Sequence, residues 1–221
     1  MSRTPVKEHA ARRLGTETSA TRTELLDAAE RLMLDEGYAA VTSRRVAAAA
    51  GLKPQLIHYY FRTMDDLFLA LYRRRADQGL ERQTLALGSA QPLWALWDLS
   101  RDPRGTALTM EFVALANHRK AIRAEIAASA EQYRAGMAKG VEAVFSRYRL
   151  NEQQYPPLVW AVLLTSISVV LVLEQESIGL SSGHAETVAF VEDWLCQIEG
   201  PRQSLGTTGR TVRSPRKGRS S

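Results

Sequence analysis

The stretch that decides the fold is Val46-Ala47-Ala48-Ala49-Ala50-Gly51-Leu52-Lys53-Pro54-Gln55-Leu56-Ile57-His58-Tyr59-Tyr60-Phe61, which predicts two short helices joined by a tight turn. Gly51 is the residue type that takes a left-handed backbone conformation without a Cβ clash. Ala47 is small enough for a second helix to cross close by, and Ile57 supplies the apolar side chain that packs the two helices together. Pro54 suits the first position of the second helix, where its missing N–H would be unpaired anyway. The order of these residues predicts a helix-turn-helix.

The second helix, predicted over residues 54–61, has two distinct faces at about 100° per residue. Ile57, Tyr60 and Phe61 fall in one sector and form an apolar face. The opposite face ends in hydrogen-bonding groups and holds no acidic residue; it carries Gln55, His58 and Tyr59. Because a carboxylate would be repelled by phosphates, an acid-free face suits the groove of a nucleic acid.

The candidate DNA contacts lie on this face and at the start of the preceding helix: Thr42, Arg44, Arg45, Lys53, Gln55, Leu56, His58 and Tyr59. Gln55 has the amide geometry to pair with an adenine edge, and Lys53 suits a phosphate or a guanine. The Thr42 hydroxyl and the first-turn amides of the helix at residues 43–49 would face a phosphate. The alternative is that these residues are simply solvated polar side chains.

The rest of the chain is predicted to be helical, which makes the fold all-α. A capping box at Thr21-Arg22-Thr23-Glu24 predicts a helix that ends near Gly37, and a second box at Thr63-Met64-Asp65-Asp66 opens the fourth helix. Further helices are predicted at residues 92–100, 105–118 and 119–149, after Pro156, and around residues 188–198. Four segments follow: a flexible basic arm (1–20), a helix-turn-helix domain (21–66), a larger helical domain (67–200), to which the family resemblance given below assigns ligand binding and dimerisation, and a disordered basic tail (201–221).

Composition excludes several classes of protein. The formal net charge is +5, but the last 21 residues hold six of the 29 basic residues and no acid, so the body is near neutral. A single cysteine, Cys196, excludes an intramolecular disulfide and a cysteine metal cluster. Neither a signal-peptide core nor an apolar run of the ~20 residues that a membrane span needs is present, so we expect a cytoplasmic protein without a membrane segment. The four histidines lack metal-ligand spacing, and we expect neither a cofactor nor a metal nor catalysis.

The N-terminal third resembles the DNA-binding domain of the tetracycline-repressor (TetR) family of transcriptional regulators. The resemblance covers roughly residues 21–71 and rests on Ala28-Ala29, Gly37-Tyr38, Thr42-Ser43-Arg44-Arg45-Val46-Ala47, Ala50-Gly51-Leu52 and His58-Tyr59-Tyr60-Phe61. The chain departs from the family pattern at Lys53, Pro54 and Gln55, which open the recognition helix. It also has Met64 where the family commonly has a phosphate-contacting lysine. The operator of a relative is therefore not transferable.

The predicted helices beyond residue 67 suggest two further sites. The uncharged helix at residues 158–173 and the apolar stripe of the last helix, around residues 188–198, predict a homodimer interface. The predicted interface residues are Leu163, Val170, Val188, Val191, Trp194, Leu195 and Ile198. The resemblance implies a cavity for a small apolar effector, and the candidate lining residues are Trp94, Trp97, Met110, Phe112, His118, Tyr133, Met137, Trp160 and Thr165. Plain core is the alternative for this set, because aromatic and Met residues at helical spacing commonly fill cores.

Together these features predict a homodimeric regulator, in the first instance a repressor, that binds a palindromic double-stranded DNA operator and is released by a small apolar effector. A sequence-tolerant DNA-coating protein driven by the basic termini is the alternative.

Overall fold

The structure is a computed structural model, and it describes residues 20–151 and 153–203. Within these residues the chain forms helices and no strand, which confirms the predicted all-α fold. The α-helices are α1 (Ala20–Glu36), α2 (Ser43–Ala49), α3 (Gln55–Tyr60), α4 (Met64–Leu87), α5 (Pro92–Ser100), α6 (Pro103–Ala116), α7 (Lys120–Arg147), α8 (Pro157–Leu173) and α9 (His184–Glu199). A 3-10 helix, η1 (Tyr38–Ala40), precedes α2, and a π-helix, η2 (Glu174–Ile178), continues α8.

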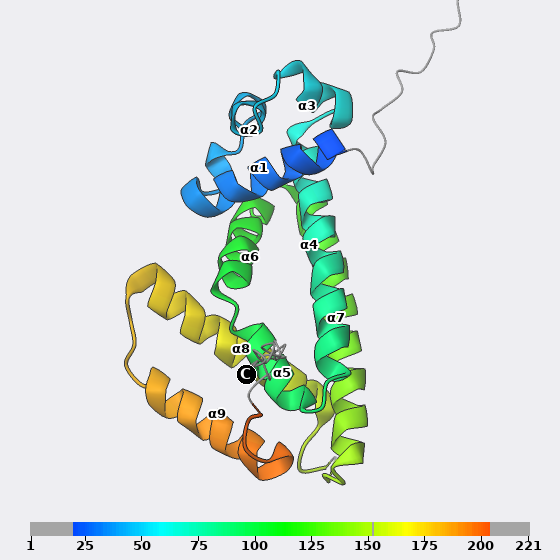
Figure 1. Ribbon diagram of the computed structural model, residues 1–221, viewed down its shortest axis with the longest axis vertical. Coiled ribbons are helices and arrows are strands. Elements are labelled where there is room, and N and C mark those ends of the chain that lie inside the picture. Colours follow the sequence, from blue (N-terminus) through cyan, green and yellow to red (C-terminus); the bar gives the residue numbers. More distant parts are fainter. Residues whose placement is uncertain (1–19, 152, 204–221) are drawn as a thin grey trace, which may run out of the picture.

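One apolar core lies at the end of the molecule formed by α1, α2, α3 and the first turns of α4 (Figure 1). Its buried members include Leu25, Met33, Val46, Ile57 and Leu67. Helix α6 reaches the same core with Leu108, Phe112 and Leu115. The N-terminal helices are therefore packed directly on a helix of the larger C-terminal part.

Helices α4 and α7 run side by side along the length of the molecule (Figure 1). Their close approach depends on Gly140, where an added Cβ would lie 2.3 Å from the Leu87 Cδ1 atom. The Gln83 side-chain amide donates to the Tyr133 carbonyl at 3.1 Å and fixes the register of the two helices. Because α4 passes without a break through the predicted boundary after residue 66, it joins the two parts of the chain.

A second core lies at the opposite end, where α5, α7, α8 and α9 meet (Figure 1). Trp97 of α5, Phe145 of α7 and Leu195 of α9 are fully buried there. Helix α5 begins with Pro92 at its N-terminus, a position at which proline loses no hydrogen bond, and its bounds are those predicted from the sequence.

The predicted helix starts are confirmed in part. The Thr63 hydroxyl accepts from the Asp66 N–H and the Asp66 carboxylate accepts from the Thr63 N–H, both at 3.1 Å, so the second capping box is confirmed. The first is wrong, because α1 already includes Ala20 and Thr21 lies within the helix. Helix α6 begins two residues before the predicted Gly105, and α7 lacks Arg119 and the last two predicted residues.

The predicted disordered tail begins too early. Gln203 donates its backbone N–H to the Gln91 side chain at 2.8 Å, and Arg202 pairs with Asp98 at 2.6 Å. Residues 201–203 therefore lie against α5. The remainder of the predicted tail, 204–221, and all but the last residue of the predicted arm lie outside the described residues.

Helix α8 and η2 form one helical segment longer than the sequence predicted. The segment Pro157–Ile178 has 22 residues and a mean hydropathy of 2.1, so it is long and apolar enough to cross a membrane by length and composition. The expectation that the apolar run is too short is thus wrong. A core helix of a soluble protein passes the same test, so this one segment does not indicate a membrane protein.

Candidate nucleic-acid interface and internal cavity

The turn between α2 and α3 is a Schellman motif centred on Gly51. The Leu52 N–H donates to the Ala47 carbonyl at 2.8 Å, and the Gly51 N–H donates to the Ala48 carbonyl at 3.1 Å. Gly51 has φ +68°, the left-handed conformation that glycine adopts at least cost. This geometry ends α2 and directs α3 across it.

Helix α3 presents the face that the sequence predicts. Ile57 and Phe61 are buried in the first core, while Gln55, His58 and Tyr59 are exposed. Pro54 precedes the helix rather than opening it, and its helical φ of −55° leads the chain into the first turn. Lys53 is exposed beside it, and Leu56 is half-buried at the edge of the exposed face.

The start of α2 lies beside this face. The Thr42 hydroxyl caps the helix by accepting from the Arg45 N–H at 3.4 Å, and Arg44 is exposed. The Arg45 guanidinium is bound to the Glu36 carboxylate at the end of α1. That hydrogen bond lowers the pKa of Glu36 and raises that of Arg45. Arg45 therefore has an intramolecular partner that competes with any phosphate.

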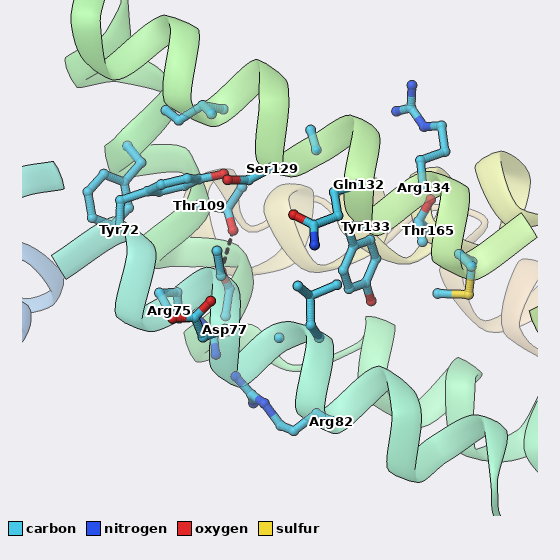
Figure 2. Close-up of a pocket in the computed structure, with 18 of the residues that line it drawn as sticks. Tyr72, Arg75, Asp77, Arg82, Thr109, Ser129, Gln132, Tyr133, Arg134 and Thr165 are labelled. Atoms are coloured by element: carbon cyan, nitrogen blue, oxygen red, sulfur yellow. Dashed lines mark hydrogen bonds between the residues drawn. The ribbon is translucent and has the colours of Figure 1, made fainter. Parts of the chain in front are cut away.

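A cavity of about 690 Å³ lies between α4, α6, α7 and α8 (Figure 2). Four of the predicted residues line it: Phe112, Tyr133, Met137 and Thr165. The volume falls within the range of small-molecule sites, roughly 300–1,000 Å³.

The other five predicted residues do not line the cavity, so the sequence prediction is wrong for them. Trp94 and Trp97 are buried in the second core, where their indole N–H groups donate to the Gly200 carbonyl at 3.1 Å and to Glu192 at 3.2 Å. Trp160 stacks on Trp194 with ring centroids 3.8 Å apart. Met110 and His118 lie on and just after α6, away from the lining. The tryptophans fasten α5 and α8 to α9, which explains why they are unavailable.

Sequence reasoning missed the charged groups of the cavity. Those on α4 are Arg73, Arg75, Asp77 and Arg82, and the others are Asp102, Glu125 and Arg134. The arginines of the run Arg73-Arg74-Arg75 point in different directions, because successive residues of an α-helix are about 100° apart. Arg74 turns to Asp27 and Glu30 of α1, whereas Arg75 lines the cavity.

Burial and pairing change the acidity of several cavity groups. Burial raises the pKa of Tyr72 and of Tyr133, so both phenols keep their protons at neutral pH. A hydrogen bond from Arg73 lowers the pKa of Glu125, and the two side chains are joined at 2.8 Å. The phenols are therefore available as donors, while Glu125 is a carboxylate already paired.

Helix α6 joins the cavity to the helix-turn-helix end of the molecule. Phe112 lines the cavity and belongs to the first core at the same time. The neighbouring Glu111 accepts from the Tyr38 N–H in η1 at 2.6 Å, and Arg104 pairs with Glu30 of α1 at 3.0 Å. Helix α6 is thus in direct contact with α1 and with η1, which precedes α2.

The predicted interface residues divide into two groups. Leu163 and Val170 of α8 are exposed, and Val188, Trp194 and Ile198 of α9 are half-buried. Val191 and Leu195 are buried inside the protomer, so the prediction is wrong for these two: the stripe of α9 faces its own core. The sequence missed Phe190, which is 75% exposed on α9 because it lies off that stripe.

Helix α2, packed through the buried Val46 and Ala47, the Schellman turn and the exposed face of α3 define a helix-turn-helix protein. Residues 25–71 match the family model described as bacterial regulatory proteins of the tetR family. The HTH-type transcriptional regulator BetI of Rhizobium meliloti (strain 1021) is 42% identical over 52 residues, which are 24% of this chain and 26% of that protein. Residues 25–71 are therefore similar to the N-terminal DNA-binding domain of tetR-family transcriptional regulators.

Solved structures extend the likeness in fold beyond this domain. A TetR-family transcriptional regulator from Rhodococcus sp. matches 82% of this chain and 100% of its own, with a TM-score of 0.63 and 18% identity. A transcriptional regulator from Saccharomonospora viridis in complex with choline matches 77% of this chain and 95% of its own, with a TM-score of 0.61 and 20% identity. At these identities the comparisons show the shared fold, whereas the match to BetI spans about a quarter of that relative.

Proposed function

We propose that this chain is a homodimeric transcriptional repressor that binds a palindromic operator and is released by a small molecule bound in the cavity. The observation that carries the proposal is the exposed, acid-free face of α3, with Gln55, His58 and Tyr59 held outward by the buried Ile57. Such a face fits the major groove, where an amide reads an adenine edge and hydroxyl or imidazole groups contact phosphates. Thr42, Arg44 and Lys53 would add backbone contacts at the rim.

The exposed apolar side of α8 and α9 supports a homodimer. Leu163, Val170 and Phe190 present large apolar side chains to solvent, and only 22% of the most apolar window of Pro157–Ile178 is buried within the protomer. A two-fold axis through these helices would bury both copies of this surface in a four-helix arrangement. The two recognition helices would then enter successive major grooves, about 34–36 Å apart.

The cavity and α6 support the release mechanism. A ligand that favours one position of α6 would shift η1 and α1 through Glu111 and Arg104. It would thereby alter the distance between the two recognition helices of the dimer. By thermodynamic linkage, bound operator DNA must lower the affinity of the protein for the ligand by the same factor by which the bound ligand lowers its affinity for DNA. The relative of similar fold from Saccharomonospora viridis holds choline, which supports a small-molecule role for this architecture.

The experiment that tests DNA reading is selection of bound sequences from random duplexes at near-physiological salt. We expect an enriched inverted repeat, and each of Gln55→Ala and Tyr59→Ala should abolish its enrichment. Gln78→Ala is the matched control, because Gln78 is an exposed residue of α4 far along the chain from α3. Salt-dependent binding without enrichment, lost on removing residues 204–221, would instead support the DNA-coating alternative.

A further inference from the structure

The cavity holds an excess of positive charge. Four arginines line it, namely Arg73, Arg75, Arg82 and Arg134, against the three carboxylates of Asp77, Asp102 and Glu125. Arg73 and Glu125 are joined to each other at 2.8 Å. The remaining lining charges are three arginines, Arg75, Arg82 and Arg134, and two carboxylates, Asp77 and Asp102. Asp102 contacts both Arg75 and Arg82.

Arg75 and Arg82 share a single carboxylate oxygen. The Asp102 Oδ2 atom lies 3.3 Å from Arg82 Nη1 and 3.7 Å from Arg75 Nη2. Among the residues that the structure describes, neither guanidinium has a second carboxylate within 4.0 Å. A guanidinium has five N–H donors in a fork that matches both oxygens of a carboxylate. One shared oxygen leaves most of these donors without a charged acceptor.

The position of Arg75 is built into the fold. An added Cβ at Gly105 would lie 2.4 Å from Arg75 Nη2, so the guanidinium rests directly against the first turn of α6. Its side chain is only 22% exposed, which weakens competition from water. Two cavity hydroxyls are committed elsewhere: Thr109 donates to the Gly105 carbonyl and Thr165 to the Ala161 carbonyl, each at 2.8 Å.

Several of the charged side chains of the cavity gather along α4, while Arg134 lies near Thr165 (Figure 2). Figure 2 shows Arg75, Asp77 and Arg82 together along α4, with Tyr133 and Thr165 farther along the cavity. Apolar side chains, among them Phe112, Ile126 and Met137, line the rest of the space. A complementary ligand is apolar over most of its length and carries one negative group at an end.

We propose that the effector is an amphipathic carboxylate, whose apolar chain fills the cavity and whose carboxylate is bound by Arg75 and Arg82. This inference rests on the proposed function and replaces the purely apolar effector that the sequence predicts. The ligand carboxylate completes the donor set that Asp102 satisfies only in part. Tyr133, which keeps its proton, is a further donor in the cavity.

The test compares probes of equal chain length and different charge on the full-length protein. Decanoate, decan-1-ol and decyltrimethylammonium are titrated into the wild-type protein by calorimetry, the two ionic probes below their micellar concentrations and the alcohol below its solubility limit. We expect decanoate to bind at least tenfold more tightly than decan-1-ol, and the cation to bind most weakly. A preference for the alcohol or the cation, or binding of none of the three, overturns the proposal.

Variants separate recognition from folding. Arg75→Met and Arg82→Met should each reduce decanoate affinity about tenfold and leave decan-1-ol affinity unchanged. Arg123→Met, at an exposed arginine of α7 that does not line the cavity, should change neither affinity. Asp102→Asn should raise the affinity for decanoate several-fold, because it removes the carboxylate that competes for Arg75 and Arg82. The substitution should not disturb α6, because the Asp102 side chain caps no helix N–H. If the cluster has only a structural role, all variants of the cluster should lose affinity for both decanoate and decan-1-ol. That result would overturn the proposal.

Measurements of operator binding distinguish failure of the anionic-effector proposal from failure of the proposed function. If the alcohol or the cation binds and releases operator DNA while decanoate does not, the anionic class is wrong and the effector-controlled regulator stands. If a probe binds in the cavity and operator affinity is unchanged, the release mechanism itself is wrong.

Discussion

The Glu111 carboxylate on α6 accepts a hydrogen bond of 2.6 Å from the backbone N–H of Tyr38, 73 positions earlier in the chain. Tyr38 opens η1, and Gly37 before it provides no side-chain cap. Glu111 therefore does from a distance what a local cap would do, and it joins the helix that lines the cavity to the segment that leads into α2. The proposed effector signal would therefore pass through a contact that also stabilises the start of η1.

Glu111→Gln should lower the free energy of unfolding by about 1 kcal/mol, because a neutral acceptor replaces an ionised one at a partly buried N–H. Urea unfolding followed by circular dichroism measures this change. Glu131→Gln is the control, since Glu131 is an exposed residue of α7. Equal stability of the two variants would contradict a capping role for Glu111.

Gly51→Ala tests the turn of the helix-turn-helix. Within residues 20–151 and 153–203, no atom other than those of Gly51 and its chain neighbours lies within 4 Å of the position that a Cβ would take. The cost is therefore that of the left-handed backbone, about 1 kcal/mol. Gly51→Asn should cost less, because asparagine tolerates this conformation better than alanine. Thermal unfolding of the two variants measures the difference. If the alanine variant has the same melting temperature as the asparagine variant, the backbone conformation is not the reason for the glycine.

The sequence predicts those parts of the fold that depend on local signals. Gly51 and the apolar Ile57 and Phe61 set the turn and the faces of α3 because their spacing alone decides which side is buried. The cavity depends instead on contacts between distant segments. Nothing near Gly105 in the sequence shows that Arg75, thirty positions earlier, lies against it, and nothing near Trp97 shows that Glu192 accepts its N–H. For the same reason the sequence predicts that the apolar stripe of α9 contacts a second subunit, whereas in the structure Val191 and Leu195 of this stripe face the core of their own protomer.

Glu36→Gln should strengthen binding to DNA. The variant releases Arg45 from its ion pair and makes the guanidinium available to a phosphate, so affinity at low salt should rise several-fold. The slope of log affinity against log salt should steepen by about 0.9 per subunit for the added contact. Fluorescence anisotropy with a labelled operator at several salt concentrations measures both quantities. An unchanged slope would show that Arg45 makes no phosphate contact; Asp35→Asn is a matched control on the same turn.

Phe190→Asp should dissociate the dimer. The side chain is 75% exposed in the protomer, so an aspartate there costs the monomer little, whereas a carboxylate buried without a partner in an interface costs several kcal/mol. Leu85→Asp on α4 is the matched control, because Leu85 is 74% exposed and lies away from α8 and α9. Sedimentation velocity at micromolar concentration should show a monomer for the first variant and a dimer for the second. Operator affinity should fall with the dimer, because one recognition helix reads only one half-site. If the Phe190 variant stays dimeric with intact operator binding, the two-fold axis does not pass through α9.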